Sequence, residues 1–295
     1  MASDRPGNAS SGRGKRSFIG VLKRAIRYTM PENGRPVQST SRRPPPEPEP
    51  IDLAVLYQDE WIIAIDKPPG MVVHPTYRNW SGTLLNGLLW HLRDTPGPKG
   101  PGLRGHVVPR IVTRLDKDTS GIVLVALTSD THARVQLDSA AQHVKKEYLA
   151  VVYGTPTPPR GSIALPLARS VVDRRRVVVD PSGQESRTDY EVLAAGSGRS
   201  VILCELVTGR THQIRVHLAA RGWPILGDRV YGEPDEAIAR QALHAWRVRM
   251  PHPATREAME IEAPIPPDLE GLVPGLVVSG FLVRRSLGEG GSRTR

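Results

Sequence analysis

Residues 113–126 read Thr-Arg-Leu-Asp-Lys-Asp-Thr-Ser-Gly-Ile-Val-Leu-Val-Ala and place a carboxylate, Asp116, on a short polar turn just before an apolar segment. The intervening residues are polar or typical of turns. Residues 122–127 are continuously apolar, which predicts a buried strand. A carboxylate on the turn that leads into a buried strand, preceded by Arg114, is positioned for chemistry more than for packing.

The composition limits the class of protein. With 295 residues, of which 39% are apolar, the chain is long enough for one large domain or two small ones. Its single cysteine, Cys204, excludes an internal disulfide framework and fits a reducing compartment. No apolar run reaches the ~18 residues of a transmembrane helix, and the N-terminal segment lacks the apolar core of a secretory signal. We therefore expect a cytoplasmic protein that does not contact a membrane.

The net charge of +10 is concentrated at the two ends of the chain. Residues 1–50 carry ten Lys and Arg against four Asp and Glu, and residues 279–295 carry four Arg against one Glu. The central part is therefore close to neutral. Basic ends raise the affinity for phosphate backbones without sequence preference, although they can equally serve solubility alone.

Composition also divides the chain into segments. Residues 1–50 are expected to form a disordered basic arm, with a short basic amphipathic helix at 18–29 and a stiff proline-rich linker at 43–50. The folded domain is expected over 51–278, and 279–295 is expected to be a disordered tail.

Strand and helix patterns alternate irregularly within the expected domain. Strands are predicted at 61–65, 122–127, 147–153 and 201–207, helices at 129–143 and 211–221, and a hairpin that pairs 171–172 with 177–179 around the basic tip 174–176. The absence of a regular βαβ order favours an α+β fold with a mixed sheet.

Taken alone, Asp116 permits two other interpretations. The first is an ordinary turn aspartate that bonds to the local backbone. The second is the Asp-x-Asp-x-Thr loop of haloacid-dehalogenase-like phosphatases, in which the first aspartate is a nucleophile beside Mg²⁺. That loop follows a hydrophobic strand, whereas here the strong apolar run comes after Asp116, so the order of the elements disfavours phosphotransfer.

The segment Arg-Leu-Asp-Lys-Asp-Thr-Ser-Gly at 114–121 resembles the catalytic motif of the RluA-type pseudouridine synthases. Four further segments resemble the other motifs of this family in the same order, at 66–75, 146–154, 208–232 and 242–253. One short motif could arise by chance, but an ordered set across nearly the whole domain could hardly do so.

The resemblance implies the isomerisation of specific uridines in RNA, ribosomal or transfer, to pseudouridine after base flipping, without metal or organic cofactor. It implies the pseudouridine synthase fold, an α+β structure with a mixed, mostly antiparallel twisted sheet, flanking helices and an RNA-binding cleft. We expect a monomer. Some relatives carry an N-terminal S4 domain, for which fifty mostly polar residues are too few.

By the same resemblance, Asp116 is the catalytic carboxylate and Arg215 is the cation that keeps it ionised in a water-poor pocket. Tyr148 stacks on the target base and takes part in late proton transfer. A catalytically silent RNA-binding protein would not need these three residues together. Without the motif, Tyr148 would be read as a packing residue and Arg215 as a surface arginine.

The resemblance also implies a set of RNA contacts. Arg114 would fill the space that the flipped nucleotide leaves, and Leu115 and Ile214 would line the pocket wall, although an ordinary core role is open for both. The remaining expected RNA contacts are Thr119, Arg210, His212 and Gln213. Many family members have His immediately before the Arg-Leu-Asp sequence, where this chain has Thr113.

Four histidines and two short basic groups complete the polar features of the domain. The spacings of the histidines fit no zinc pattern, so structural or RNA-facing roles are expected for His212, His217, His244 and His252. Phosphate contact or simple solvation is open for the basic tip 174–176 and for 145–146.

Overall fold

The computed structural model describes residues 45–77, 79–96 and 107–272. In this part of the chain the strands are β1 (Ala54–Gln58), β2 (Ile62–Lys67), β3 (Arg110–Ile111), β4 (Ser120–Ala126), β5 (Lys145–Tyr153), β6 (Arg160–Ile163), β7 (Leu167–Arg169), β8 (Val177–Val179), β9 (Thr188–Gly196), β10 (Arg199–Leu206), β11 (Leu243–Pro251) and β12 (Ala258–Glu262). The helices are α1 (Leu84–His91), α2 (Ser129–Ala140) and α3 (Gln213–Ala220).

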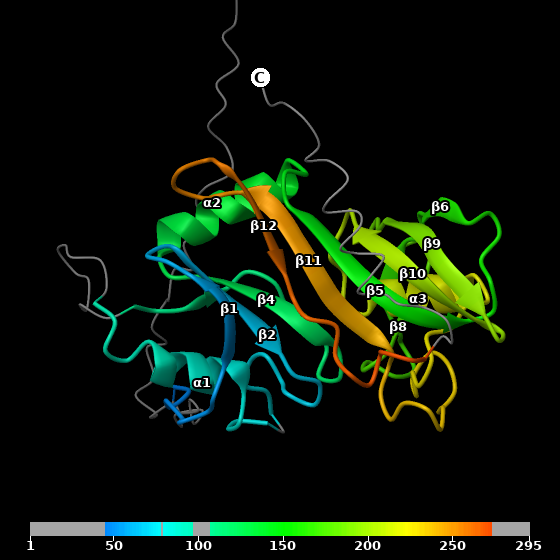
Figure 1. The fold of residues 1–295 in the computed structure, drawn as a ribbon, viewed down its shortest axis with the longest axis horizontal. Helices are drawn as coiled ribbons and strands as arrows, with labels where there is room; N and C mark the ends of the chain where they lie inside the picture. The colour runs from blue at the N-terminus through cyan, green and yellow to red at the C-terminus, as the bar shows by residue number, and fades with distance from the viewer. Residues whose placement is uncertain (1–44, 78, 97–106, 273–295) are drawn as a thin grey trace, which may run out of the picture. The chain divides into compact units, whose positions relative to one another are not determined.

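One large sheet organises the described residues, with the strand order β1-β2-β4-β11-β5-β10-β9-β6 (Figure 1). β12 pairs with β11 and β3 with β4, while β7 and β8 form a separate ribbon. The large sheet is antiparallel throughout except where β4 meets β11 in parallel. This confirms the expected α+β class with a mixed, mostly antiparallel sheet.

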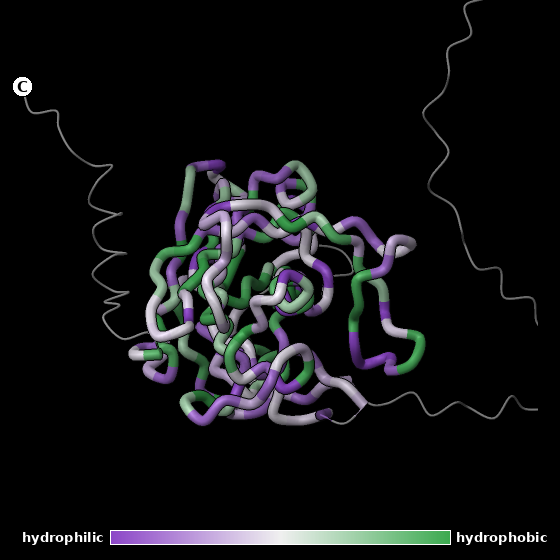
Figure 2. Tube along the Cα trace, turned by 90° about the vertical axis from the view of Figure 1, so that its right-hand side faces the viewer, coloured by the Kyte–Doolittle hydropathy of each residue, from purple (hydrophilic) through white to green (hydrophobic). Residues whose placement is uncertain are grey.

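Helices cover both faces of the sheet near β2 and β4. α1 packs Leu84 and Leu88 against Ile63 and Ile65, while α2 packs Val135 into a separate cluster on the other side. Figure 1 shows α1 and α2 on opposite sides of this region. Because β4 is buried on both faces, its sequence is continuously apolar and does not alternate. In Figure 2, several of the outer loops carry hydrophilic stretches.

The predicted helices are present with shifted ends. α2 is capped by Thr128, whose side chain accepts from the backbone of Thr131, and it ends at Ala140, before the expected 143. α3 begins two residues later than predicted, because His212 adopts a left-handed backbone with φ of 56°. Gly222, with φ of 79°, follows its end, as expected for a glycine at a helix C-terminus.

The predicted pairing of 171–172 with 177–179 is wrong. β8 pairs instead with β7, and residues 170–176 form the connecting tip. The side chains of Ser170 and Asp173 accept hydrogen bonds from backbone N–H groups of the tip, which stabilises a turn. Val171 and Val172 are therefore 96% and 94% exposed and pair with no strand.

Some expectations lie wholly or partly outside the described residues, namely the arm helix at 18–29, most of the arm and the tail at 279–295. Two residues of the expected linker do contact the domain, since the Glu47 carbonyl accepts from Asn86 and the Glu49 carboxylate accepts from the Gly82 N–H. Among the helices described, none is long and apolar enough to cross a membrane.

The register of three adjacent strands brings the candidate catalytic segments together. Gly121 of β4 lies beside Ala245 of β11, and Ala245 lies opposite Tyr148 of β5. A Cβ at Gly121 would lie 2.2 Å from the Ala245 carbonyl oxygen, and its φ is 106°, so this close parallel contact requires glycine. The loop that precedes β4, which carries Asp116, consequently opens beside Tyr148.

Candidate active site

The Asp116 loop is anchored at its start by Thr113. The Thr113 hydroxyl accepts a 2.8 Å hydrogen bond from the Leu124 N–H, and the Thr113 N–H donates to the Leu124 carbonyl over 3.2 Å. These bonds extend the short β3–β4 ladder by one position. Thr113 therefore ties the loop to β4 through its hydroxyl.

Lys67 and Arg240 hold the middle of the same loop. Lys67 is fully buried at the end of β2, and its ammonium donates to the carbonyl of Lys117 over 3.0 Å. Burial lowers the pKa of Lys67 to about 8, against the attraction of Asp118. Arg240 donates to the Asp118 carbonyl over 3.2 Å and forms a two-pronged ion pair with Asp268. Bonds to successive carbonyls restrict the backbone next to Asp116.

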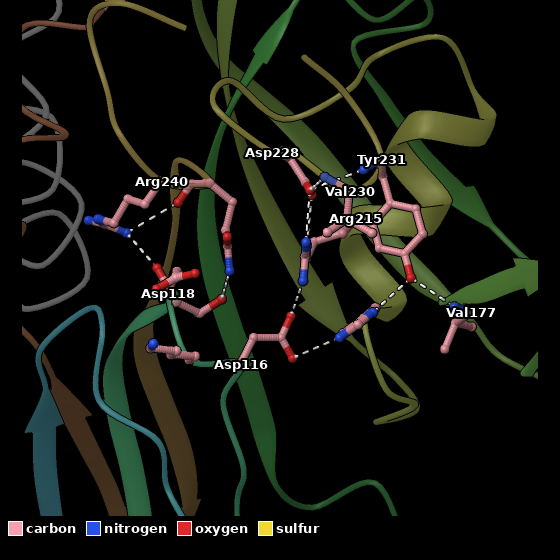
Figure 3. A network of polar contacts seen from close by, with 12 residues as sticks. Asp116, Asp118, Val177, Arg215, Asp228, Val230, Tyr231 and Arg240 are labelled. Carbon is pink, nitrogen blue, oxygen red and sulfur yellow. Dashed lines mark hydrogen bonds and ion pairs between the residues drawn. The ribbon is translucent and has the colours of Figure 1, made fainter. Parts of the chain in front are cut away.

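Arg215 on α3 lies between two carboxylates (Figure 3). Its Nη1 donates to Asp116 Oδ2 over 2.7 Å, while its Nε and Nη2 donate to the two oxygens of Asp228 over 2.7 and 2.8 Å. The Arg215 and Asp228 side chains are only 6% and 1% exposed, whereas that of Asp116 is 24% exposed. The buried ion pair thus presents one guanidinium nitrogen to a carboxylate that remains accessible.

The charges of this network set its protonation. Burial alone would raise the pKa of Asp228, but the hydrogen bonds and charge of Arg215 and two backbone N–H groups hold it below its usual value. Burial likewise opposes the charge of Arg215, yet the two carboxylates raise its pKa. The backbone that presents Asp228 turns at Gly227, where φ is 68° and a Cβ would lie 2.3 Å from the Arg240 carbonyl oxygen.

Tyr148 forms another wall of the site. Its side chain is almost fully buried, and burial together with the negative charge of Asp116 raises the pKa of its hydroxyl. The phenol is therefore protonated at neutral pH. Its side chain lines the same pocket as Asp116.

All of the site residues predicted from the sequence line this one pocket, together with Leu206 and Leu243. Thr119 and Gln213 use their side chains for hydrogen bonds inside the protein: the Thr119 hydroxyl accepts from Gln241, and the Gln213 amide donates to Thr188 and accepts from the Arg210 N–H. Arg114 is exposed at the pocket rim.

Two residues that contact Arg215 were not predicted individually, Asp228 and Tyr231. Tyr231 contacts the imidazole of His212 edge-on, and its ring lies 5.1 Å from the Arg215 guanidinium. Both residues belong to a segment that supported the family resemblance, but no role was attached to them. A buried guanidinium needs more than one hydrogen-bond acceptor. Asp228, which directly follows a glycine in the segment 208–232, was the residue in the sequence that could have been proposed as the second acceptor.

The other three histidines singled out from the sequence, His217, His244 and His252, bond inside the protein. His217 lies 2.9 Å from the Thr188 hydroxyl, His244 lies 2.9 Å from that of Ser120, and His252 lies 2.7 Å from the Asp59 carboxylate. Burial lowers the pKa of His244 to about 4, so this ring is neutral. These histidines have structural surroundings, in contrast to His212 at the pocket.

Comparison with known proteins decides the family. The family model described as RNA pseudouridylate synthase matches residues 61–220, which is more than half of the chain. The chain belongs to the RluA-type RNA pseudouridine synthases. This synthase is accordingly an isomerase that converts uridine in RNA to pseudouridine, and the phosphotransfer interpretation of its Asp-x-Asp-x-Thr sequence is wrong.

The similarity of the synthase to known proteins extends over most of its length. It is 38% identical to the "Ribosomal large subunit pseudouridine synthase D" of Zymomonas mobilis, over 79% of this chain and 75% of that protein. It is 39% identical to the "Uncharacterized RNA pseudouridine synthase YlyB" of Bacillus subtilis, with the same coverages. Among solved structures, "Human RNA Pseudouridylate Synthase Domain Containing 1" superposes with a TM-score of 0.60 at 25% identity, over 80% of this chain and 95% of that one.

Proposed function

We propose that this synthase modifies uridine in the RNA of the large ribosomal subunit and that Asp116 performs the chemistry. The accessible carboxylate paired with a buried arginine beside a tyrosine ring carries the catalytic proposal. The names of the relatives from Zymomonas mobilis and Nitrosomonas europaea support the choice of ribosomal over transfer RNA. Mapping pseudouridines in total RNA with and without the gene tests the substrate, and a site lost only from transfer RNA would contradict it.

In the proposed mechanism, Asp116 acts on the flipped nucleoside as nucleophile or as base. Arg215 donates to Oδ2 and not to Oδ1, so Oδ1, which has two lone-pair positions, can accept one hydrogen bond and still react. The guanidinium also stabilises the ionised carboxylate, which a pocket emptied of water would otherwise protonate. Each step in this scheme uses side chains of the chain itself, with Arg114 filling the position that the flipped base leaves.

A basic groove beside the catalytic pocket is the proposed RNA surface. Arg114 and Arg210 line both the pocket and this neighbouring groove of about 550 Å³, to which β7 adds Arg169. None of the described residues that line the groove carries a carboxylate. The hairpin tip adds Arg174 and Arg176 to this positive charge, whereas Arg175 forms a two-pronged ion pair with Asp173. Unopposed arginines along a groove suit a phosphate backbone.

We expect the double replacement Arg169→Ala and Arg210→Ala to weaken RNA binding roughly tenfold or more at low salt, because two phosphate contacts are removed. The slope of log affinity against log salt should fall by about 0.7 for each phosphate of single-stranded RNA that an arginine no longer neutralises. Binding titrations at several salt concentrations measure both effects. Arg134→Ala, an exposed arginine of α2, is the control. An unchanged slope in the double variant would contradict the proposed surface.

Replacing Tyr148 by phenylalanine should preserve RNA binding but slow turnover by about 10²-fold or more, because the ring still stacks while the proton-transferring hydroxyl is gone. Single-turnover conversion and RNA affinity, measured on the same preparation, separate the two steps. Tyr190→Phe removes a largely buried hydroxyl from β9 and should leave turnover unchanged. Normal turnover by the Tyr148 variant would contradict a proton-transfer role.

We further propose that the catalytic domain spans 51–278, that the synthase acts as a monomer in the cytoplasm, and that the basic segments on either side of the domain add RNA affinity without sequence preference. The concentration of positive charge in these segments supports the last point.

A further inference from the structure

A row of polar contacts connects β8 to Asp116 through two side chains. The backbone N–H of Val177 donates to the hydroxyl of Tyr231 over 2.8 Å. The same hydroxyl lies 2.7 Å from Nδ1 of His212, and Nε2 of that imidazole lies 3.7 Å from Oδ1 of Asp116. Figure 3 shows the Tyr231 hydroxyl joined to Val177 on one side and to an imidazole on the other.

The contacts of the Tyr231 hydroxyl favour one tautomer of His212. Its oxygen accepts from Val177, so its own proton needs a different acceptor, and Nδ1 of His212 is the acceptor within hydrogen-bond distance among the described residues. A neutral imidazole carries one proton, which must then be on Nε2. The opposite tautomer would direct the lone pair of Nε2 at the Asp116 carboxylate.

The surroundings of His212 favour the neutral ring. Burial and the positive charge of Arg215 lower its pKa, and these effects exceed the opposing attraction of Asp116 and Asp228. The side chain is 19% exposed. A neutral ring with a fixed tautomer can offer one N–H to one oxygen of the ionised carboxylate while Arg215 donates to the other.

Two further observations indicate that the position of this ring is specified. His212 adopts a φ of 56°, a backbone conformation that residues other than glycine rarely adopt. Tyr231 is itself held in place, because its N–H donates to Asp228 over 3.1 Å and its ring lies beneath the Arg215 guanidinium. The tyrosine that orients His212 is thus attached to the same ion pair that orients Asp116.

We propose that His212 is a positioning residue, in which Tyr231 fixes the Nε2–H tautomer so that His212 holds Oδ1 of Asp116 while Arg215 holds Oδ2. The inference rests on the proposed role of Asp116. Without RNA, the 3.7 Å separation exceeds a hydrogen bond, and it shortens to one when the bound nucleotide displaces water, as catalytic hydrogen bonds commonly do. His212 therefore acts on the carboxylate and not on the RNA.

The tautomer can be measured without any catalytic assay. Long-range ¹H–¹⁵N correlation spectra of the full-length chain distinguish the two tautomers and the protonated ring, and the spectrum of His212→Gln assigns the signal. The wild type should show the neutral ring protonated at Nε2 near neutral pH, and Tyr231→Phe should lose this preference. A proton found on Nδ1, or an unchanged tautomer in Tyr231→Phe, would overturn the proposal.

Kinetics test the consequence for the reaction. We expect His212→Leu to lower the single-turnover rate about tenfold to a hundredfold, the effect of one hydrogen bond to a charged group, with RNA affinity unchanged. His212→Gln keeps an N–H near the position of Nε2 and should recover part of the rate. Equal defects in the two variants, or a loss in RNA affinity alone, would overturn the positioning role. If the wild type left RNA unmodified, the proposed function would fail, while the tautomer measurement would still stand.

Discussion

Replacing Asp116 by asparagine should abolish the conversion of uridine while leaving the protein folded. The substitution removes the anionic oxygen that we propose as nucleophile or base, and we expect a loss of at least about 10⁴-fold in rate. Release of tritium from RNA labelled at C5 of uridine measures the reaction. RNA affinity should change little, because the amide keeps the shape of the carboxylate.

The fold should tolerate this change, since Arg215 keeps both hydrogen bonds to Asp228 and can still donate to the amide oxygen of the new side chain. Thermal unfolding within a few degrees of the wild type would verify this. Asp130→Asn, at the exposed first turn of α2, is the matched control and should keep full activity. Full tritium release by the Asp116 variant would exclude the aspartate from the chemistry.

The sequence predicted the members of the site better than their arrangement. Asp116 and Arg215 are 99 positions apart, so no local pattern could place them in contact. The family resemblance named both, and the structure places Nη1 of Arg215 2.7 Å from Asp116. Burial and the second carboxylate of the ion pair depend on the packing of α3 against a distant loop, which periodicity does not encode.

The errors in secondary structure have the same physical origin. The valines at 171–172 have strand propensity, but the polar side chains of Ser170 and Asp173 stabilise a turn, and the true partner of β8 lies on the far side of this turn. In contrast, β4 was recognised because a strand buried on both faces is apolar at every position. Local composition identified the elements, whereas their partners depended on long-range contacts.

Replacing Arg215 by methionine should be the most destabilising single change in the site. It leaves the Asp228 carboxylate, whose side chain is 1% exposed, without its cation, and breaking such a buried pair costs about 3–5 kcal/mol in the free energy of unfolding. Activity should also be lost, because Asp116 loses its only guanidinium partner among the described residues. Urea unfolding and tritium release measure the two effects.

A second replacement separates stability from catalysis. In the double variant Arg215→Met with Asp228→Asn, the buried anion is gone and the amide oxygen can still accept from the Val230 and Tyr231 N–H groups. We expect most of the stability to return while activity remains absent. A double variant as unstable as Arg215→Met would show that packing, and not the uncompensated charge, causes the loss.

The pH dependence of the stability lost in Arg215→Met tests whether the uncompensated charge of Asp228 causes the loss. In the wild type the pKa of Asp228 lies below its usual value, so its contribution to stability is present above about pH 4 and is lost as the pH falls through the folded-state pKa. In Arg215→Met, burial without the cation raises this pKa, so the carboxyl becomes protonated at a higher pH and the variant avoids a buried charge in acid. The difference in unfolding free energy between wild type and variant should therefore be largest near pH 7 and shrink toward pH 4. An equal difference at both pH values would contradict a charge-based role for Arg215.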